Sequence, residues 1–263
     1  MRTAALSLAA AVVLGGYVNV SGHRMYYECT GSGRPTVVLD AGSPDTSTTW
    51  RWVQPQIARF TTACAYERAG LGRSAPAAPG RRTAETQVHD LLALLTAAHI
   101  PGPYVVVGHS WGGLLARLFA AAAPAKTAGL VLVDATTFAG LTAATARRLP
   151  RKTNREGIDI PAAVAESAAV KTLGSLPLVV LGSNKPPLDA AFLRAQDQEA
   201  ALSTDHVDAV ARRSTHYIQK PAPAGQPQVV VTAVSAVVAA VRRHQRLASC
   251  RKLFAAAAVS CRS

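Results

Sequence analysis

One serine in this sequence has the surroundings that a nucleophile requires. Ser110 is the centre of Gly108-His109-Ser110-Trp111-Gly112, a G-x-S-x-G pattern that follows a run of valines and precedes an apolar pattern at helical spacing. Glycines two residues to either side permit the sharp strand-to-helix turn on which a serine is held outward. A serine hydroxyl attacks poorly without a base, and the oxyanion that it creates needs hydrogen-bond donors in place. The pattern predicts Ser110 as the nucleophile of an acyl-transfer reaction.

The segments around this turn repeat a strand-then-helix pattern. Short apolar runs typical of buried parallel strands recur before and after Ser110, and patterns at helical spacing separate them, in the order 36–40, 50–60, 61–66, 83–100, 129–134, 177–181, 188–202 and 228–243. The 263 residues are 49% hydrophobic, enough for one α/β domain with a buried core. We expect this domain over residues 17–244, with a small cap at about 136–173, where Ala-rich and basic pieces interrupt the rhythm.

Three motifs resemble those of the α/β-hydrolase superfamily of the AB hydrolase-1 type, and most of all its secreted bacterial members. They are the run from Tyr66 to Ser74 (YERAGLGRS), the elbow GHSWGG at 108–113, and Ser214-Thr215-His216. The resemblance runs from about residue 17 to 243 and implies the α/β-hydrolase fold, a mostly parallel central sheet with helices on both faces. Two departures are Glu67, where the family usually has Asp, and Gln219-Lys220, which replaces an acidic residue often found after the histidine.

His216 is the expected general base. Of the seven histidines, five lie early, in or before the elbow, or at the end of the last helix, namely His23, His89, His99, His109 and His244. His216 follows a predicted strand and precedes the final helix, as the family's histidine loop does, whereas His206 precedes that strand. A base must take the serine proton and later return it. His109 is expected to support the elbow instead.

Two carboxylates compete for the role of orienting the imidazole. In most of the superfamily the acid follows the strand that here spans 178–181, and Asp189 lies a few residues beyond that strand. Some members, such as certain haloalkane dehalogenases, take it from the end of the strand after the nucleophile helix, where Asp134 stands. We favour Asp134 and keep Asp189 as the alternative. The non-catalytic interpretation of Asp134 is that it ends a strand and only caps the segment that follows.

The oxyanion donors are expected from two backbone N–H groups. At such an elbow the N–H of Trp111 belongs to the first turn of the helix and points toward the oxyanion. The superfamily takes a second donor from the loop after an earlier strand, here Ala41-Gly42-Ser43-Pro44, and the N–H of Ser43 is our choice. A plain βα turn is the alternative for this loop.

These residues together predict a serine hydrolase that cleaves small esters through a Ser110-His216-Asp134 triad and an acyl-enzyme, with no metal and no cofactor. A peptidase of the proline-iminopeptidase type or a cofactor-free haloperoxidase would use the same triad, because the superfamily shares it across chemistries. For the peptidase, the cap offers Glu156, Asp159 and Glu166 as carboxylates that could bind a free amine. A non-enzymatic binding protein on the same fold is the alternative of another class.

The first residues and the cysteines point to export. A positive start and an apolar run occupy residues 1–16, which are signal-like and too short and Ala/Gly-rich for a membrane span. The cysteine count is even, which favours disulfides in an exported chain. Of the three possible pairings, Cys29 with Cys64 and Cys250 with Cys261 closes the most local loops, the second within a tail at 245–263. We expect a secreted or cell-envelope protein.

The charge is lopsided but dispersed. The chain has 28 Lys and Arg against 15 Asp and Glu, a formal net charge of +13. The basic residues occur as scattered pairs, and no RRM, helix-turn-helix or aromatic-basic stripe accompanies them. Nucleic acid is therefore not an expected partner. We expect a small-molecule ester as substrate and, at most, loose attraction to anionic polymers of the cell envelope.

Overall fold

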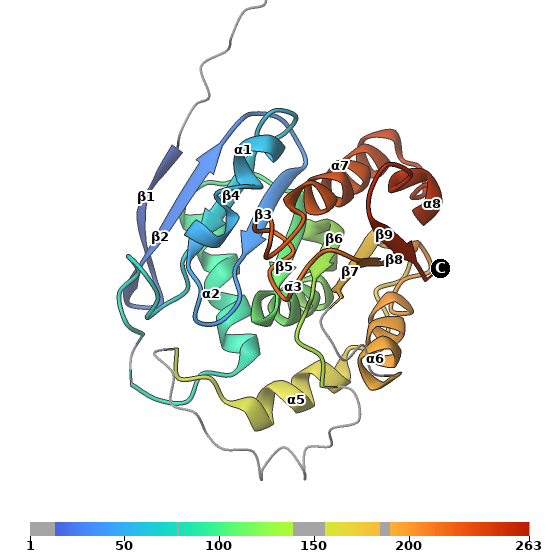
Figure 1. The fold of residues 1–263 in the computed structure, drawn as a ribbon. Helices are drawn as coiled ribbons and strands as arrows, with labels where there is room; N and C mark the ends of the chain where they lie inside the picture. Colours follow the sequence, from blue (N-terminus) through green and yellow to red (C-terminus); the bar gives the residue numbers. More distant parts are fainter. Residues whose placement is uncertain (1–13, 78, 139–155, 185–189, 263) are drawn as a thin grey trace, which may run out of the picture.

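The computed structural model describes residues 14–77, 79–138, 156–184 and 190–262, and these form a single sheet with helices on both faces (Figure 1). Within them nine strands occur in the spatial order β1-β2-β4-β3-β5-β6-β7-β8-β9. The strands are β1 (Leu14–Val20), β2 (His23–Thr30), β3 (Thr36–Asp40), β4 (Ala63–Tyr66), β5 (Tyr104–His109), β6 (Thr127–Val133), β7 (Leu178–Ser183), β8 (His206–Ala211) and β9 (Val259–Cys261).

The six central strands are parallel, and the strands at both ends of the sheet are antiparallel. Neighbours from β4 through β3, β5, β6 and β7 to β8 pair in parallel, whereas β1 with β2, β2 with β4, and β8 with β9 pair antiparallel. Parallel neighbours need crossover connections, which the helices supply. The carboxyl ends of β3, β5, β6 and β7 therefore meet at one edge of the sheet, and this is the edge where such folds place their sites.

The sheet separates the core into two layers, and helices cover each of them. They are α1 (Gln54–Ile57), α2 (Ala84–Ala97), α3 (Trp111–Ala122), α5 (Ile160–Ala169), α6 (Ala190–Ala200), α7 (Pro227–Arg243) and α8 (Cys250–Leu253), with 3-10 turns η1 (Ser47–Trp50) and η2 (Pro124–Lys126). Because side chains alternate across a strand, Val106 of β5 packs in the layer with α2 and α3, while Val105 and Val107 pack in the layer with α7. Both layers are fully buried, as the apolar runs predicted.

The sheet extends beyond the domain expected from the sequence at both ends. β1 begins at Leu14, so the last three residues of the signal-like segment 1–16 belong to a strand paired with β2, and residues 1–13 lie outside the described residues. The expected tail after residue 244 contributes α8 and the edge strand β9. A three-residue strand that joins its neighbour only through tertiary pairing leaves little periodicity in the sequence to detect.

Both expected disulfides are confirmed. Cys29 and Cys64 lie directly opposite each other on β2 and β4, with their Cα atoms 4.0 Å apart. Cys250 at the start of α8 is bonded to Cys261 in β9, with Cα atoms 5.7 Å apart. Each bridge therefore ties down an end of the sheet, and the second one holds the edge strand that the sequence did not reveal.

The cap expected at 136–173 is described in part. Residues 139–155 lie outside the described residues, and α5 forms from the segment that follows them, with the side chain of Asp159 accepting the N–H of Ala162 at its first turn. α5 lies across α2 and α3, near the edge of the sheet where the parallel strands end (Figure 1). No helix among the described residues is long and apolar enough to cross a bilayer.

Candidate active site

Ser110 lies on a tight turn between β5 and α3, with a backbone conformation that few side chains adopt. Its φ is 52° and its ψ is −118°, and its N–H donates to the carbonyl of Val133 at 3.1 Å. A Cβ at Gly108 would lie 2.2 Å from the carbonyl oxygen of Gly112, and one at Gly112 would lie 2.4 Å from that of Asp40. Only glycine fits both positions, so the flanking glycines are what allow the turn. Such a conformation costs about 1–3 kcal/mol.

The structure brings His216 and Asp134 into a hydrogen bond. His216 Nδ1–H donates to Asp134 Oδ2 at 2.5 Å, which leaves the other ring nitrogen of His216 for proton transfer. The second oxygen of Asp134 accepts the N–H of Ser183 at 2.8 Å, at the end of β7. In most of the superfamily the acid follows this strand, and here the strand end holds the carboxylate from β6 instead. The alternative acid, Asp189, lies outside the described residues.

Asp134 also has a positive φ, 44°, although it is not a glycine. It directly follows β6, and its N–H donates to the carbonyl of Leu181 at 2.7 Å. The turn therefore aims the carboxylate across the sheet edge toward the loop after β8, which carries His216. No hydrogen bond joins the Ser110 hydroxyl to His216 among the described residues; in ligand-free enzymes this contact often tightens only once substrate binds. We name Ser110, His216 and Asp134 the candidate triad.

His109 connects the elbow to the histidine loop. Its Nε2–H donates to the backbone carbonyl of His216 at 2.9 Å, because a carbonyl can only accept. The two imidazole rings lie 4.6 Å apart, and the Nδ1 of His109 is buried with no partner among the described residues. Burial, together with the neighbouring His216, lowers the pKa of His109 to about 3. His109 is thus neutral and fixes the position of the histidine loop, in agreement with the supporting role expected for it.

The two expected oxyanion donors lie on either side of Ser110. Trp111 is the first residue of α3, where an N–H has no acceptor within the helix, and its indole N–H donates to Gln87 at 2.9 Å. The loop of Gly42 and Ser43 follows β3, and a Cβ at Gly42 would lie 3.1 Å from the Cβ of Ser110. The Gly42–Ser43 loop therefore lies beside Ser110, on the side where the second oxyanion donor is expected.

The two departures from the family pattern both serve the loops around the site. The Glu67 carboxylate accepts the Ser47 hydroxyl at 2.9 Å and the N–H of Arg73, so it holds its own loop together. The Gln219 amide is buried and donates to the Thr49 hydroxyl at 3.1 Å. The latter contact joins the histidine loop to the segment after the Gly42–Ser43 loop.

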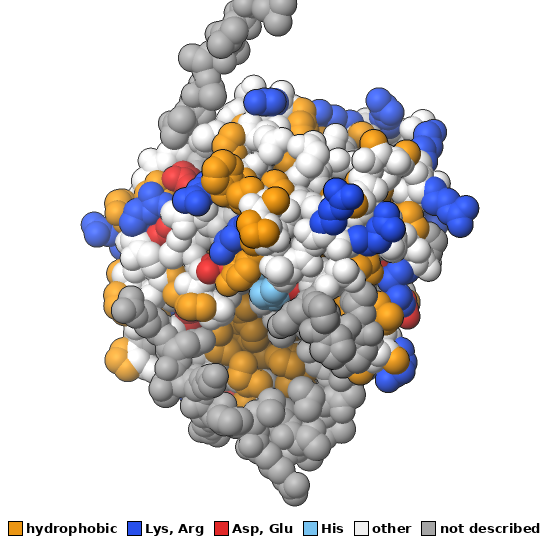
Figure 2. Space-filling view, in the orientation of Figure 1, with side chains coloured by type: hydrophobic (Ala, Val, Ile, Leu, Met, Phe, Trp, Pro, Cys, Tyr) orange, Lys and Arg blue, Asp and Glu red, His pale blue; other side chains and the backbone are white. Residues whose placement is uncertain are grey.

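A hollow and a cavity lie on the side of the molecule that carries the candidate triad. Figure 2 shows a hollow on this side of the molecule that is lined with hydrophobic side chains and has a histidine at its rim. Next to the loop after Asp134 lies a cavity of about 260 Å³, whose walls include the side chains of Thr137, Phe138, Val164, Val170, Leu202 and the buried pair Arg117 and Glu199. Ser167 and Gln198 also line this cavity, so its lining is mixed and suits a small molecule that carries both apolar and polar groups.

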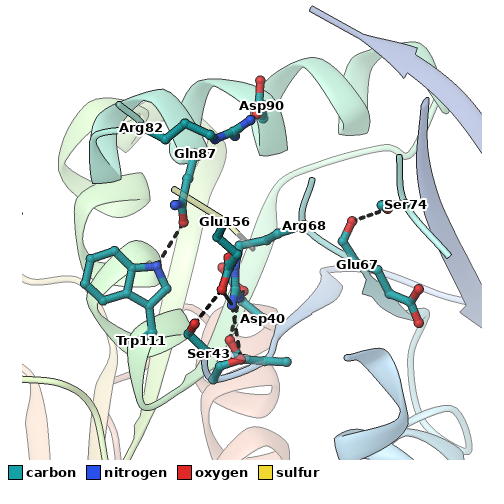
Figure 3. A network of polar contacts seen from close by, with 12 residues as sticks. Asp40, Ser43, Glu67, Arg68, Ser74, Arg82, Gln87, Asp90, Trp111 and Glu156 are labelled. Carbon is teal, nitrogen blue, oxygen red and sulfur yellow. Dashed lines mark hydrogen bonds and ion pairs between the residues drawn. The ribbon is translucent and has the colours of Figure 1, made fainter. Parts of the chain in front are cut away.

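A second polar cluster lies behind the Gly42–Ser43 loop, and sequence reasoning missed it. Figure 3 shows Asp40, Arg68 and Glu156 converging with Ser43 at the end of β3. Arg68 is part of the YERAG motif, and Asp40 is the last residue of a strand that ends at the edge of the candidate site. Both positions could therefore have indicated a role near the site from the sequence alone. Glu156 lies within the expected cap, where nothing in the spacing connects it to the loop.

Among the described residues no group of three or more His, Cys, Asp or Glu side chains is arranged to hold a metal ion. The carboxylates expected to bind an amine in a peptidase are engaged elsewhere: Glu156 by Arg68 and Ser43, Asp159 by Arg81, and Glu166 by the N–H of Glu85.

A family model establishes the affiliation of the chain. The model of the alpha/beta hydrolase family matches residues 37–259, so the chain belongs to the alpha/beta hydrolase family. The predicted superfamily and fold class are confirmed.

Relatives with curated sequences match over shorter stretches. Uncharacterized protein YqjL of Bacillus subtilis (strain 168) is 36% identical over 104 residues, which is 40% of this chain and 41% of that protein. The soluble epoxide hydrolase of Corynebacterium sp. (strain C12) is 38% identical over 103 residues, 38% of this chain and 34% of the relative. The chain thus aligns with well under half the length of these relatives.

Solved structures extend the likeness to the whole fold. A thermophilic esterase from Thermogutta terrifontis superposes with a TM-score of 0.66 at 22% identity, covering 86% of this chain and 99% of that one. The epoxide hydrolase CorEH gives 0.65 at 19% identity, covering 88% of this chain and all of its own. At such identities the likeness extends to the fold and not to the substrate.

Proposed function

We propose that the protein is a serine hydrolase that cleaves small carboxylic esters. The observation that carries the proposal is the strained turn at Ser110 beside the hydrogen-bonded pair of His216 and Asp134. In the mechanism, His216 takes the Ser110 proton as the hydroxyl attacks the ester carbonyl, and Asp134 stabilises the resulting imidazolium.

The rest of the cycle uses the backbone. The N–H groups of Trp111 and Ser43 bind the oxyanion of the tetrahedral intermediate, and collapse of this intermediate expels the alcohol, which takes the proton from His216. A water molecule then attacks the acyl-enzyme, with His216 again as the base, and releases the carboxylic acid. No step in this cycle needs a cofactor.

The residue at the nucleophile position separates this proposal from epoxide hydrolase chemistry. Related enzymes that open epoxides or remove halogens form an alkyl-enzyme ester on an aspartate, and this chain has Ser110 there. The aligned stretch of the Corynebacterium epoxide hydrolase therefore supports a shared fold segment rather than a shared substrate. A peptidase of the proline-iminopeptidase type is less favoured, because the described cap carboxylates are engaged by protein donors.

A labelling and turnover experiment tests the proposal. We expect a fluorophosphonate probe to label the folded protein, and Ser110→Ala to abolish both labelling and hydrolysis of p-nitrophenyl esters, since removal of a catalytic serine costs about 10⁶ in kcat. A series of acyl lengths run beside amino-acid amides sets the substrate class. Faster turnover of the amides would favour the peptidase, and a folded protein that takes no label would favour a binding protein.

A further inference from the structure

Three charged side chains lie buried together behind the Gly42–Ser43 loop, and the proposed reaction uses none of them. The side chains of Arg68, Asp40 and Glu156 are 4%, 1% and 1% exposed. Burying charges is expensive unless they are paired and hydrogen-bonded, and replacing such a group with apolar side chains is often neutral or stabilising. Stability alone is therefore a weak explanation for this cluster, which we name the loop anchor.

Arg68 holds the backbone of the loop from behind. Its Nη1 donates to Asp40 Oδ1 and to the carbonyl of Ala41, both at 2.5 Å, and its Nη2 donates to the carbonyl of Gly42 at 3.1 Å. Burial works against the cation, but Glu156 and Asp40 outweigh it and raise the pKa of Arg68. The guanidinium is therefore a permanent, rigid fork that fixes two consecutive carbonyls.

Fixing a carbonyl also fixes the N–H of the same peptide unit. In a planar trans peptide the C=O and the following N–H point in opposite directions. The carbonyl of Gly42 is directed at Arg68, so the N–H of Ser43 is directed away from it. A Cβ on Gly42 would lie 3.1 Å from that of Ser110, which puts the nucleophile close to this peptide unit.

Glu156 completes the arrangement from the cap. Its Oε2 accepts Arg68 Nε at 2.6 Å, while its Oε1 accepts Arg68 Nη2 at 3.2 Å and the Ser43 hydroxyl at 2.5 Å. The same residue whose N–H is the proposed oxyanion donor is thus held by its side chain to the segment that precedes α5 (Figure 3). The donor is fixed on both its backbone and its side chain.

We propose that Arg68 and Glu156 are positioning residues that set the Ser43 N–H for the oxyanion and tie the cap segment to that donor. The inference rests on the proposed function. An oxyanion donor acts on the transition state and not on the bound ester, so a displaced donor lowers kcat and leaves KM nearly unchanged.

Glu156→Gln is the main test, because it keeps the size of the side chain and removes the charge. We expect kcat for the best p-nitrophenyl ester to fall about 10- to 100-fold, with KM within about twofold of wild type. This decrease does not exceed the one expected when an oxyanion donor is removed altogether, because the Ser43 N–H is displaced and not lost. The inhibition constant of a boronic acid, whose tetrahedral adduct places an oxygen at the oxyanion position, should rise by a similar factor. The matched control is Asp159→Asn, another buried carboxylate of the same segment, paired with Arg81 and out of contact with the loop.

Ser43→Ala provides a second route to the same contact, since it removes the hydroxyl and keeps the N–H. We expect a drop in kcat of about tenfold and, in the double variant with Glu156→Gln, a loss smaller than the product of the two single losses, because both changes weaken the hydrogen bond between Ser43 and Glu156. This variant also keeps the test decisive if Glu156→Gln does not fold. If the substitutions only destabilised the protein as a whole, KM would change, Tm would fall, and the decreases in kcat of the two single variants would multiply in the double variant.

The outcomes separate the two proposals. An active wild type in which Glu156→Gln and Ser43→Ala both behave like Asp159→Asn overturns the positioning role and leaves the proposed function standing. A folded wild type that neither takes the fluorophosphonate label nor turns over esters overturns both.

Discussion

The candidate triad and the loop anchor lie on opposite sides of one short loop, and they are built in different ways. In the triad, Ser110 and Asp134 have positive φ values of 52° and 44°, and the His216 side chain is 36% exposed. In the loop anchor no side chain is more than 4% exposed, and Arg68 alone makes hydrogen bonds to two carboxylates and two carbonyls. The Asp134 side chain is only 6% exposed, so within its pair with His216 exposure is confined to the base, while the positive φ values lie at Ser110 and Asp134 and the paired charges lie where the backbone must stay still.

This difference indicates a division of labour. A nucleophile and its base need an outward position and a route for protons, which the strained turns and the half-exposed imidazole give. The donor of an oxyanion hole needs the opposite, since it contributes most when it does not have to move as charge develops. A buried ionic cluster that costs desolvation energy is a reasonable means to hold such a donor.

The largest expected effect comes from the acid of the triad. Asp134→Asn should keep the fold and lower kcat by about 10⁴, because the imidazole then lacks the carboxylate that fixes its tautomer and stabilises its cation. Steady-state kinetics on one ester, with circular dichroism to verify folding, provides the measurement.

Asp189→Asn is the matched control for that prediction. It should remain within about tenfold of wild type, a change in the barrier of no more than roughly 1.4 kcal/mol, since on this assignment Asp189 does not orient His216. The reverse ranking would assign the acid to Asp189 and make Asp134 a structural residue of the strand end.

The sequence predicted the fold, and the residues proposed for the candidate site were found from the same kind of signal. Ser110, Asp134 and Ser43 all follow apolar runs that end at the same sheet edge, and glycines mark the turns, so local patterns carry the information. Loop length only favoured one disulfide pairing among three, and the partners Cys29 and Cys64 proved to be cross-strand neighbours.

The sequence could not predict the loop anchor or the last strand. Glu156 reaches Arg68 over 88 positions in the chain, and β9 pairs with β8 over about 50, so neither contact leaves a periodic signal. The role of Ser183 was also hidden, because a backbone N–H that holds Asp134 can belong to any residue type. Contacts of this kind depend on tertiary packing rather than on local composition.

The candidate triad region and the loop anchor also differ in how acid changes the free energy of unfolding. His109, which lies beside the triad, is expected to cause the larger change. Its pKa is about 3 in the folded protein, below the ordinary 6.5, because burial disfavours the cation. Between these values the unfolded chain binds a proton that the native state does not, so stability is present above pH 6.5 and is lost as the pH falls.

His109→Gln tests this response, since its amide can still donate to the His216 carbonyl. From pH 7 to pH 5 the wild type should lose about 2 kcal/mol of unfolding free energy more than the variant does. Urea unfolding at both pH values measures the difference. Equal losses in the two proteins would mean that His109 is charged or exposed in the native state.

The smallest effect belongs to Asp40 of the loop anchor and has the opposite sign. Burial raises the pKa of Asp40 to about 6 from its ordinary 3.8, although Arg68 beside it acts in the other direction. The native state then holds a proton that the unfolded chain has released, so this group adds stability as the pH falls through 6 and loses it as the pH rises. From pH 7 to pH 5 the gain is about 1 kcal/mol.

Asp40→Asn cannot titrate, so it should lack this gain and lose about 1 kcal/mol relative to wild type between pH 7 and pH 5, whatever its stability at pH 7. Asp197→Asn, at a carboxylate whose side chain is 53% exposed, controls for the loss of one acidic group. Parallel urea-unfolding curves for wild type and Asp40→Asn at the two pH values would show that Arg68 keeps Asp40 ionised throughout. The loop anchor would then carry a fixed net negative charge behind the proposed oxyanion donor. Arg68 would be paired with two carboxylates that are both ionised over this pH range.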